Sequence, residues 1–448
     1  MRADIIIRNC MILTMSEQGV VKQGLIALKN GKIIYVGKEI EAPAFKAEKI
    51  INGRGKIVMP GLINCHTHVA MTLFRSMAED RRLDEWLREI IWPLEAELKP
   101  QDVYHGALLG CIEMIKSGTT CFSDMYFHED MVAKAVAETG LRCILSPGIL
   151  GQETLGKMLL KKAISIVENY HGAANGRILT MLGPHAVYSC SQRLLRKVAE
   201  KSSELNVGIH MHLAESLSES VNVKEKYGKS EAEVLNELRL LGPRFLAAHC
   251  IHLSDTDIAL MAKHDVKVVY NPVSNMKLAT GIPRIKDLID TGLTVGLGTD
   301  GPASNNSLDM FETMKFAALL QKVKYEDPRV LSAKRVVEMA TIDGARALGL
   351  DNLIGSLEVG KKADIIVIDA DKPHLTPIYD PYATIVYSAR GSDVSTVIVD
   401  GKIVMENGEI KTVDENKIME KAEGASRDLL NRSSLRGKLL TLFLRRGM

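Results

Sequence analysis

The fold is predicted most directly by one stretch of sequence, Pro60-Gly61-Leu62-Ile63-Asn64-Cys65-His66-Thr67-His68, in which two histidines close an apolar run. Successive side chains of a β-strand point to opposite faces, so His66 and His68 share one face. Two imidazoles side by side can hold a divalent metal such as zinc and leave room for other ligands and a water. They could equally form an ordinary polar rim, so this stretch alone leaves both interpretations open.

Three later apolar runs also end in a polar residue that can bind a metal, namely His212, His249 and Asp300. In a (β/α)₈ barrel the carboxyl ends of the parallel strands meet at one face, and the active site is built there. Strand ends of this kind, separated by helical stretches, therefore predict a (β/α)₈ barrel with a metal site at that face.

Strand and helix patterns alternate between residues 59 and 358, as a barrel requires. Helical stretches such as Gln101 to Lys116 and Leu194 to Leu205 fill the gaps between strands. We expect eight strands, beginning near Leu62, Thr119, Leu141, Ile178, Val207, Phe245, Lys267 and Leu293.

Both ends of the chain have a different sequence pattern, in which short β-rich runs are separated by turns such as Asn30-Gly31. Neither residues 1–58 nor residues 359–412 hold enough strands for a core, so we expect them to pair into one composite β-sandwich domain. Residues 413–448 should form a C-terminal helical tail. We expect its basic end, residues 433–446, to pack on the barrel or on a neighbouring subunit, although an amphipathic segment of this kind could also touch a membrane.

Composition is typical of a large globular enzyme, with 448 residues, 46% of them hydrophobic. The 57 basic and 55 acidic residues are nearly balanced, which predicts no nucleic-acid partner and no attraction to anionic lipid. Seven scattered cysteines without a CxxC pair argue against a disulfide framework and against a thiolate zinc site. No uncharged run reaches membrane-spanning length. We therefore expect a cytoplasmic protein.

The motifs as a set resemble the amidohydrolase superfamily, in the same order and over nearly the whole chain. They are His66-Thr67-His68, His212-Leu213-Ala214-Glu215, Ala248-His249-Cys250 and Gly298-Thr299-Asp300-Gly301. Two further segments, Trp86 to Glu95 and Gly183 to Ser191, resemble the 5-methylthioadenosine/S-adenosylhomocysteine deaminases and the related 5′-deoxyadenosine deaminases.

This resemblance implies hydrolytic deamination of 5′-modified adenosines to the inosine derivatives plus ammonia, by a zinc-dependent aminohydrolase that acts on cyclic amidines. 5′-Methylthioadenosine, S-adenosylhomocysteine and 5′-deoxyadenosine are the leading substrates, and adenosine is a further candidate. Two alternatives stay open. One is another aminohydrolase of the superfamily that acts on guanine, cytosine or a triazine, and the other is a non-catalytic member that serves as a binding protein.

For the metal, we expect His66, His68, His212 and Asp300 to hold one Zn²⁺ per subunit, with Fe²⁺ or Mn²⁺ as alternatives. Such a positively charged site favours loss of a proton from bound water, so that hydroxide can be the nucleophile near pH 7. Members of the superfamily with two metals bridge them through a lysine at the end of the fourth strand. The stretch 178–185 contains no lysine, which predicts a mononuclear site.

Proton transfer is assigned to residues beside the metal ligands. The resemblance implies that Glu215 moves protons from the water to the ring nitrogen and then to the leaving amino group. From its position alone, Glu215 could equally be an acid at the start of a helix. His249 and Asp300 are expected to orient or deprotonate the water.

Substrate contacts are expected from Glu95 and His185, together with Glu215 and Asp300. The resemblance implies that Glu95 receives the two ribose hydroxyls, since a carboxylate can accept two hydrogen bonds from a diol. His185 matches the family residue that touches the nucleoside.

Other candidate residues keep a structural interpretation. Trp86 and Trp92 would wall the pocket, although core packing explains them equally well. His210 shares one strand face with His212 and could support the metal ligands without binding the metal, but we expect it to fill the barrel interior. His252 is expected to lie in a loop or at a helix start. We also expect the chain to form a homo-oligomer.

Overall fold

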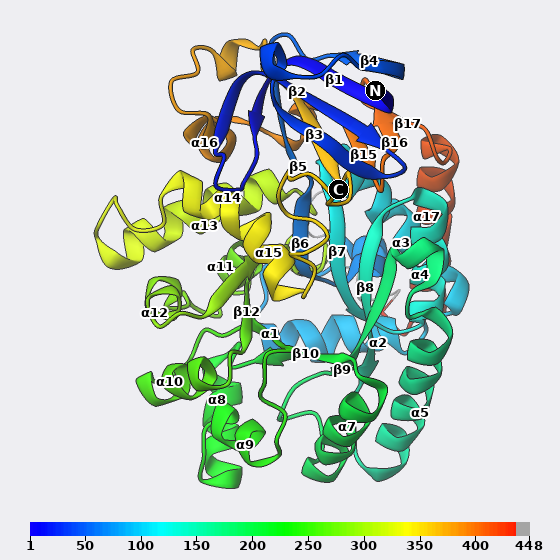
Figure 1. The fold of residues 1–448 in the computed structure, drawn as a ribbon. Helices are drawn as coiled ribbons and strands as arrows, with labels where there is room; N and C mark the ends of the chain where they lie inside the picture. Colours follow the sequence, from blue (N-terminus) through cyan, green and yellow to red (C-terminus); the bar gives the residue numbers. More distant parts are fainter. Residues whose placement is uncertain (436–448) are drawn as a thin grey trace.

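The computed structural model describes residues 1–435 and contains two β-sheets, one above the other in the view of Figure 1. The lower sheet is parallel and runs in chain order from β6 to β13. Each of its strands begins at the predicted residue or one residue later, so the predicted (β/α)₈ barrel is confirmed. The strands are β6 (Leu62–Thr67), β7 (Thr119–Tyr126), β8 (Arg142–Ile149), β9 (Ile178–Pro184), β10 (Gly208–Leu213), β11 (Phe245–His249), β12 (Lys267–Tyr270) and β13 (Thr294–Leu297).

The first and last strands of the barrel approach each other at their carboxyl ends. The backbone N–H of Asp300 donates to the carbonyl oxygen of His66 at 3.0 Å. A Cβ atom at Gly298 would lie 2.9 Å from the same carbonyl oxygen, so glycine permits this close approach. The point where the barrel closes is therefore the point where two of the predicted metal ligands meet.

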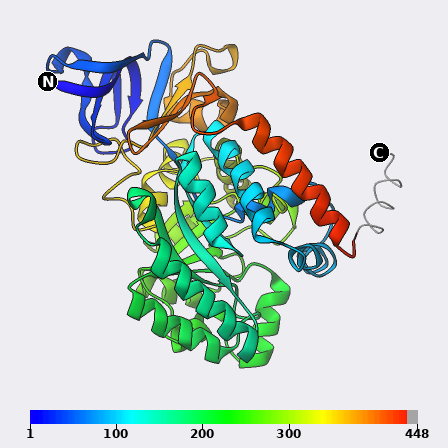
Figure 2. The ribbon, with the colours of Figure 1, turned by 90° about the vertical axis from the view of Figure 1, so that its right-hand side faces the viewer.

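The longer helices lie on the outside of the barrel (Figure 1, Figure 2). In α7 the buried residues Leu194, Leu195 and Val198 form one stripe, and Ser191 caps the helix by accepting from the Leu194 N–H. The two helices predicted from sequence are present within α3 and α7. The helices of the barrel region are α3 (Pro100–Lys116), α4 (Glu129–Thr139), α5 (Glu153–Tyr170), α7 (Gln192–Leu205), α8 (Leu217–Tyr227), α9 (Glu231–Glu237), α10 (Asp255–Lys263), α11 (Pro272–Lys277), α12 (Ile285–Asp290), α13 (Met310–Tyr325), α14 (Ala333–Met339) and α15 (Ile342–Ala347).

The second sheet is mixed and is built from both ends of the chain. β5 pairs with β1 on one side and with β14 on the other, and buried residues of both terminal segments share one core. The predicted joining of the two ends is therefore present, while the domain limits at residues 58, 358 and 412 stay a prediction. The strands are β1 (Arg2–Leu13), β2 (Val20–Lys29), β3 (Lys32–Lys38), β4 (Lys46–Asn52), β5 (Lys56–Pro60), β14 (Ile365–Asp369), β15 (Val394–Val399), β16 (Lys402–Glu406) and β17 (Glu409–Ile410).

The last described helix, α17 (Glu415–Arg432), packs along α3 on the outside of the barrel (Figure 2). Arg432 forms an ion pair with Asp102, and the Ser426 hydroxyl donates to the carbonyl oxygen of Leu73 at 2.8 Å. Most of the basic end predicted to pack on the barrel or a neighbour lies at 436–448, outside the described residues. Within residues 1–435, no helix combines the length and the apolar content needed to cross a membrane.

Candidate metal centre and active site

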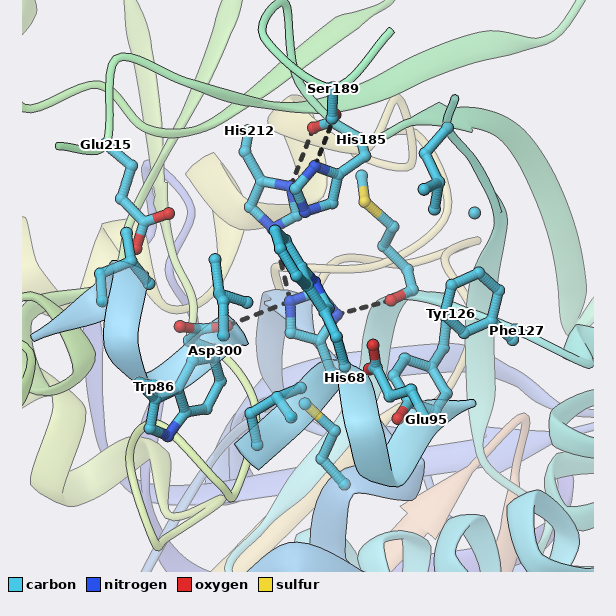
Figure 3. Close-up of a pocket in the computed structure, with 18 of the residues that line it drawn as sticks. His68, Trp86, Glu95, Tyr126, Phe127, His185, Ser189, His212, Glu215 and Asp300 are labelled. Atoms are coloured by element: carbon cyan, nitrogen blue, oxygen red, sulfur yellow. Dashed lines mark hydrogen bonds and ion pairs between the residues drawn. The ribbon is translucent and has the colours of Figure 1, made fainter. Parts of the chain in front are cut away.

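The four predicted metal ligands come together at the carboxyl ends of three strands, and Figure 3 shows three of them, His68, His212 and Asp300. His66 lies in β6, His68 follows it directly, His212 lies in β10, and Asp300 comes three residues after β13. The Asp300 Oδ1 atom is 3.5 Å from His66 Nε2 and 3.3 Å from His68 Nε2. The Nε2 atoms of His212 and His68 are 3.4 Å apart.

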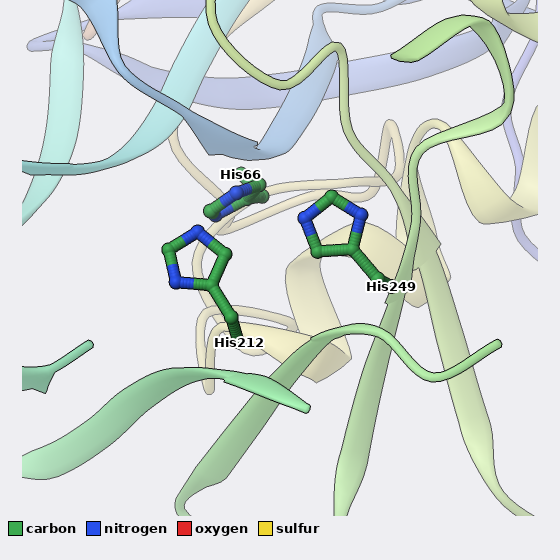
Figure 4. Close-up of side chains that lie close together, drawn as sticks. All are labelled: His66, His212 and His249. Carbon is green, nitrogen blue, oxygen red and sulfur yellow. The ribbon is translucent and has the colours of Figure 1, made fainter. Parts of the chain in front are cut away.

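These separations fit one divalent ion. Tetrahedral zinc with bonds of about 2.0–2.1 Å places its ligand atoms roughly 3.3 Å from one another. The Nε2 atom of His66 is buried and has no hydrogen-bond partner among the described residues, which suits a metal ligand. His249 also lies close, since one nitrogen from each of His66, His212 and His249 falls within 4.8 Å of the others (Figure 4).

Backbone carbonyls orient two of the histidines. His68 Nδ1 lies 2.5 Å from the carbonyl oxygen of Met125, and His212 Nδ1 lies 2.9 Å from that of His185. A carbonyl can only accept, so each Nδ1 carries the proton and each Nε2 presents its lone pair to the centre of the cluster.

Asp300 and His249 are held by two serine hydroxyls and an asparagine amide, which were not predicted from the sequence. Ser274 and Ser304 donate to Asp300 Oδ2 at 2.6 and 2.8 Å. The Asn275 amide lies 2.9 Å from His249 Nδ1. All three partners follow barrel strands closely in sequence, so their location at the carboxyl-terminal face was a usable signal.

Burial sets the protonation states that a metal requires. It lowers the pKa of His68 to about 4 and that of His249 to about 3. Burial also lowers the pKa of His212 well below its usual range, with neighbouring histidines acting in the same direction. For Asp300, burial acts to raise the pKa, but the neighbouring His66, His68 and His249 together hold it well below the usual range. Neutral imidazoles and an ionised carboxylate are the ligand forms for zinc.

The backbone is strained where these side chains turn inward. His249 and Asp300 have φ angles of 73° and 61°, and Ala214, just before Glu215, has 49°. Such left-handed conformations are costly for residues other than glycine, and they concentrate at functional sites.

Glu215 precedes helix α8 and is not part of its first turn. The helix is capped by Ser216, and its first-turn acid is Glu219, which accepts from the Glu215 backbone N–H at 3.2 Å. The Glu215 Oε1 atom lies 3.7 Å from His249 Nδ1. Burial raises the pKa of Glu215 well above its usual range, and the charges of Asp300 and Glu231 add to this effect. Both effects favour the protonated form of this carboxyl group.

A cavity of about 680 Å³ lies in front of this cluster, and the other predicted substrate residues line it. Glu95 comes from α2 (Trp92–Glu95) and lies beside Tyr126 in Figure 3. Burial raises the pKa of Glu95 to about 7, while the Tyr126 hydroxyl acts in the opposite direction. His185 follows β9, and its Nδ1 atom is 2.8 Å from the Ser189 hydroxyl.

The cavity has two chemically different sides. We call the cluster of His66, His68, His212, His249 and Asp300 the polar floor; all of these residues except His66 line the cavity. A second group of lining residues, the apolar wall, comes from residues 83–96 and from helix α5, and its main members are Leu83, Trp86, Leu87, Ile91, Trp92, Leu155 and Leu159. Both tryptophans therefore line the cavity, and no lysine or arginine of the described chain does.

The two histidines with a structural interpretation are placed as follows. His210 is fully buried in the barrel interior, and its Nε2 atom lies 2.8 Å from His66 Nδ1. His252 hydrogen-bonds the carbonyl oxygen of Thr280 and does not line the cavity.

Comparison with known proteins agrees with this fold. Residues 57–404 match the amidohydrolase family. This match covers more than half of the chain. The chain therefore belongs to the amidohydrolase family.

Similar proteins extend over almost the full length. A 5′-deoxyadenosine deaminase of Methanosarcina acetivorans is 49% identical, over 96% of this chain and 100% of its own length. A 5-methylthioadenosine/S-adenosylhomocysteine deaminase of Moorella thermoacetica is 48% identical, over 92% of this chain and 97% of its own. Among solved structures, an adenosine deaminase of Xanthomonas campestris with bound zinc superposes with a TM-score of 0.92 at 30% identity, covering 96% of this chain and 99% of its own.

Proposed function

We propose that this chain catalyses the hydrolytic deamination of 5′-modified adenosines, which yields the corresponding inosine derivative and ammonia. The observation that carries the proposal is that Glu215 and Glu95 project into one cavity from either side of His68 (Figure 3). The Glu215 carboxyl group lies beside the proposed metal ligands, where the reaction would occur. The Glu95 carboxyl group lies where it could bind the ribose. The deaminases named above support the same substrate class.

The metal set proposed is His66, His68, His212 and Asp300, holding one zinc ion per subunit. A bound zinc ion supplies the nucleophile at neutral pH by lowering the pKa of water to about 7. His249 and Asp300 orient the attacking water and accept its hydrogen bond. The zinc in the Xanthomonas campestris structure supports the choice of metal.

Glu215 is proposed to carry the protons. It protonates the ring nitrogen beside the attacked carbon, which makes that carbon more electrophilic. The resulting carboxylate then takes up a proton from the attacking water and delivers it to the departing amino group, which leaves as ammonia. The direction of its pKa shift suits this role, because burial raises the pKa of Glu215 and so favours the protonated form that donates first.

Glu95 and His185 are proposed to position the nucleoside. The Glu95 carboxylate accepts hydrogen bonds from the ribose 2′- and 3′-hydroxyls. His185 lies next to His212, with ring centres 4.8 Å apart, and so faces the substrate close to the metal. The apolar wall is left to receive the 5′ substituent, which in 5′-deoxyadenosine and 5′-methylthioadenosine is small and uncharged. We further propose that the enzyme is cytoplasmic and homo-oligomeric.

The test is ammonia release over a panel of substrates, with metal analysis of the same sample. We expect turnover of 5′-deoxyadenosine, 5′-methylthioadenosine and related adenosines. Preferential turnover of guanine, cytosine or a triazine would instead assign the chain to another aminohydrolase activity. Tight nucleoside binding without ammonia release would make it a binding protein.

A further inference from the structure

His210 differs from the other buried histidines because its ring contacts His66, a predicted metal ligand, at the ring nitrogen that faces away from the metal site. Its Nε2 atom lies 2.8 Å from Nδ1 of His66, and both side chains are fully buried. On its other edge, His210 Nδ1 lies 3.3 Å from the Ser123 hydroxyl and 3.2 Å from the Ser146 hydroxyl. These residues come from β6, β10, β7 and β8, so the contacts form a chain across the barrel interior.

The positions of the protons in this row of hydrogen-bonded side chains follow from the number of protons that each imidazole ring carries. A neutral imidazole carries one proton, so one of its nitrogens donates and the other accepts. If His66 presents the lone pair of Nε2 to the metal, its proton must sit on Nδ1 and be donated to His210 Nε2. His210 must then carry its own proton on Nδ1, where the two serine hydroxyls can accept it.

The other ligand histidines have no such dependence. Backbone carbonyls, which can only accept, hold the Nδ1 protons of His68 and His212. A carbonyl cannot be removed by substitution and has no second tautomer. His66 is held by a side chain that can itself be either donor or acceptor, so its tautomer depends on what lies beyond it.

We propose that His210 is a positioning residue for the metal site: it fixes the Nδ1-protonated tautomer and the ring orientation of His66, and Ser123 and Ser146 fix His210 in turn. The inference rests on the metal set proposed above. It assigns His210 a role beyond filling the barrel interior, because a side chain that only filled space would need no acceptor facing His66.

Substitutions can separate an acceptor from a space filler. In His210→Gln the side-chain amide reaches the former Nε2 position and can still accept from His66. In His210→Asn the amide lies near the former Nδ1 position and cannot. His210→Phe keeps a ring of similar shape without any acceptor. His171, which bonds Thr180 away from the cluster, provides the control His171→Phe.

The readout is the zinc dissociation constant of each purified protein, measured by competition with a chelator. His210→Phe and His210→Asn should bind zinc about 10- to 100-fold more weakly than wild type. His210→Gln should recover most of that loss, and His171→Phe should match wild type. A double variant, Ser123→Ala with Ser146→Ala, should weaken zinc binding in the same direction by a smaller factor.

A spectroscopic arm reports the tautomer without metal. In metal-free protein labelled with ¹⁵N-histidine, ring spectra should show His66 protonated on Nδ1 in wild type and partly protonated on Nε2 in His210→Asn. If His210→Phe fails to fold, the comparison of Gln with Asn carries the test. Wild-type zinc affinity in the Asn variant, or equal loss in Asn and Gln, would overturn the proposal. A wild-type protein that binds no zinc would instead remove the proposed metal site itself.

Discussion

The polar floor and the apolar wall belong to one cavity, but the protein builds them in different ways. The floor residues sit at the ends of barrel strands, and all are buried except His68, which is partly exposed. Hydrogen bonds of 2.5–2.9 Å hold the sides of His68, His212, His249 and Asp300 that face away from the metal site. The wall residues come from short helical segments and from α5, and two of them, Trp92 and Leu155, are 43% and 45% exposed.

This difference separates two properties of the enzyme. A floor with fixed protonation states and oriented ligands suits a single reaction, since every group must hold its position within a fraction of an ångström. The main wall residues have apolar side chains and lie partly in solvent, so we expect that they can change without disturbing the reacting groups. We therefore expect substitutions in the floor to change the rate of chemistry and substitutions in the wall to change the choice of substrate.

The largest effect is expected from removing a ligand in the floor. His66→Ala should lose both metal and turnover, because metal stabilisation of the transition state is worth several kcal/mol, or a rate factor of about 10³ or more. Metal content and ammonia release measured on the same sample check this, and His105→Ala, on α3, serves as the control. Two metal equivalents per wild-type chain, or full activity without metal, would refute the mononuclear site.

The next effect concerns proton transfer beside the floor. Glu215→Gln keeps the size and polarity of the side chain but cannot cycle a proton, so kcat should fall by about 10² to 10⁴ while metal content persists. Glu225→Gln, an exposed position on α8, is the matched control. An unchanged kcat would show that Glu215 only supports local structure.

A smaller effect is expected at Glu95, between floor and wall. Glu95→Ala should lower kcat/KM for 5′-modified adenosines by roughly 2 to 4 kcal/mol, because charged hydrogen bonds to the ribose are lost in a partly desolvated site. Analogues without the 2′- and 3′-hydroxyls should be poor substrates of the wild type and should lose little more in the variant. Glu97→Ala, at an exposed position nearby, should behave as wild type. If the wild-type enzyme deaminates free adenine as efficiently as the nucleosides, Glu95 does not bind the ribose.

The same carboxyl group predicts a pH dependence. Burial raises the pKa of Glu95 from 4.5 to about 7, so the carboxylate that accepts from the ribose is present above pH 7 and is lost as the pH falls. For ribosides, kcat/KM should therefore fall through this region by up to about tenfold per pH unit. Glu95→Gln should lack this limb. If the variant keeps the limb unchanged, another group is responsible for it.

The residues of the polar floor could be predicted from the sequence for a physical reason. Strands of a parallel barrel are buried on both faces, so they appear as continuous apolar runs, and polar residues that end them stand out. All eight strand starts were predicted to within one residue, and the predicted metal ligands lie together. Whether they bind zinc stays a prediction.

The wall and the supports of the floor could not be predicted in the same way. Leu155 lines the cavity while Met158, one turn later on α5, does not, and a hydrophobicity pattern does not distinguish them. The contact between His66 and His210 joins strands that are not neighbours in the sheet, so no local spacing reveals it. Such pairings depend on the radius and stagger of the barrel, which one sequence does not state.

The smallest effect should come from the wall, and it tests whether the wall sets the choice of substrate. Because no lysine or arginine of the described chain lines the cavity, the zwitterionic homocysteine group of S-adenosylhomocysteine has no cation for its carboxylate. Leu155→Lys supplies one at a half-exposed position, and an ion pair there is worth up to about 1 kcal/mol. The ratio of kcat/KM for S-adenosylhomocysteine over 5′-methylthioadenosine should therefore rise about threefold to fivefold, with metal content unchanged. Met158→Lys adds the same charge on α5 outside the cavity and should leave the ratio as it is. Equal shifts in both variants would mean that overall charge, and not the wall, governs the preference.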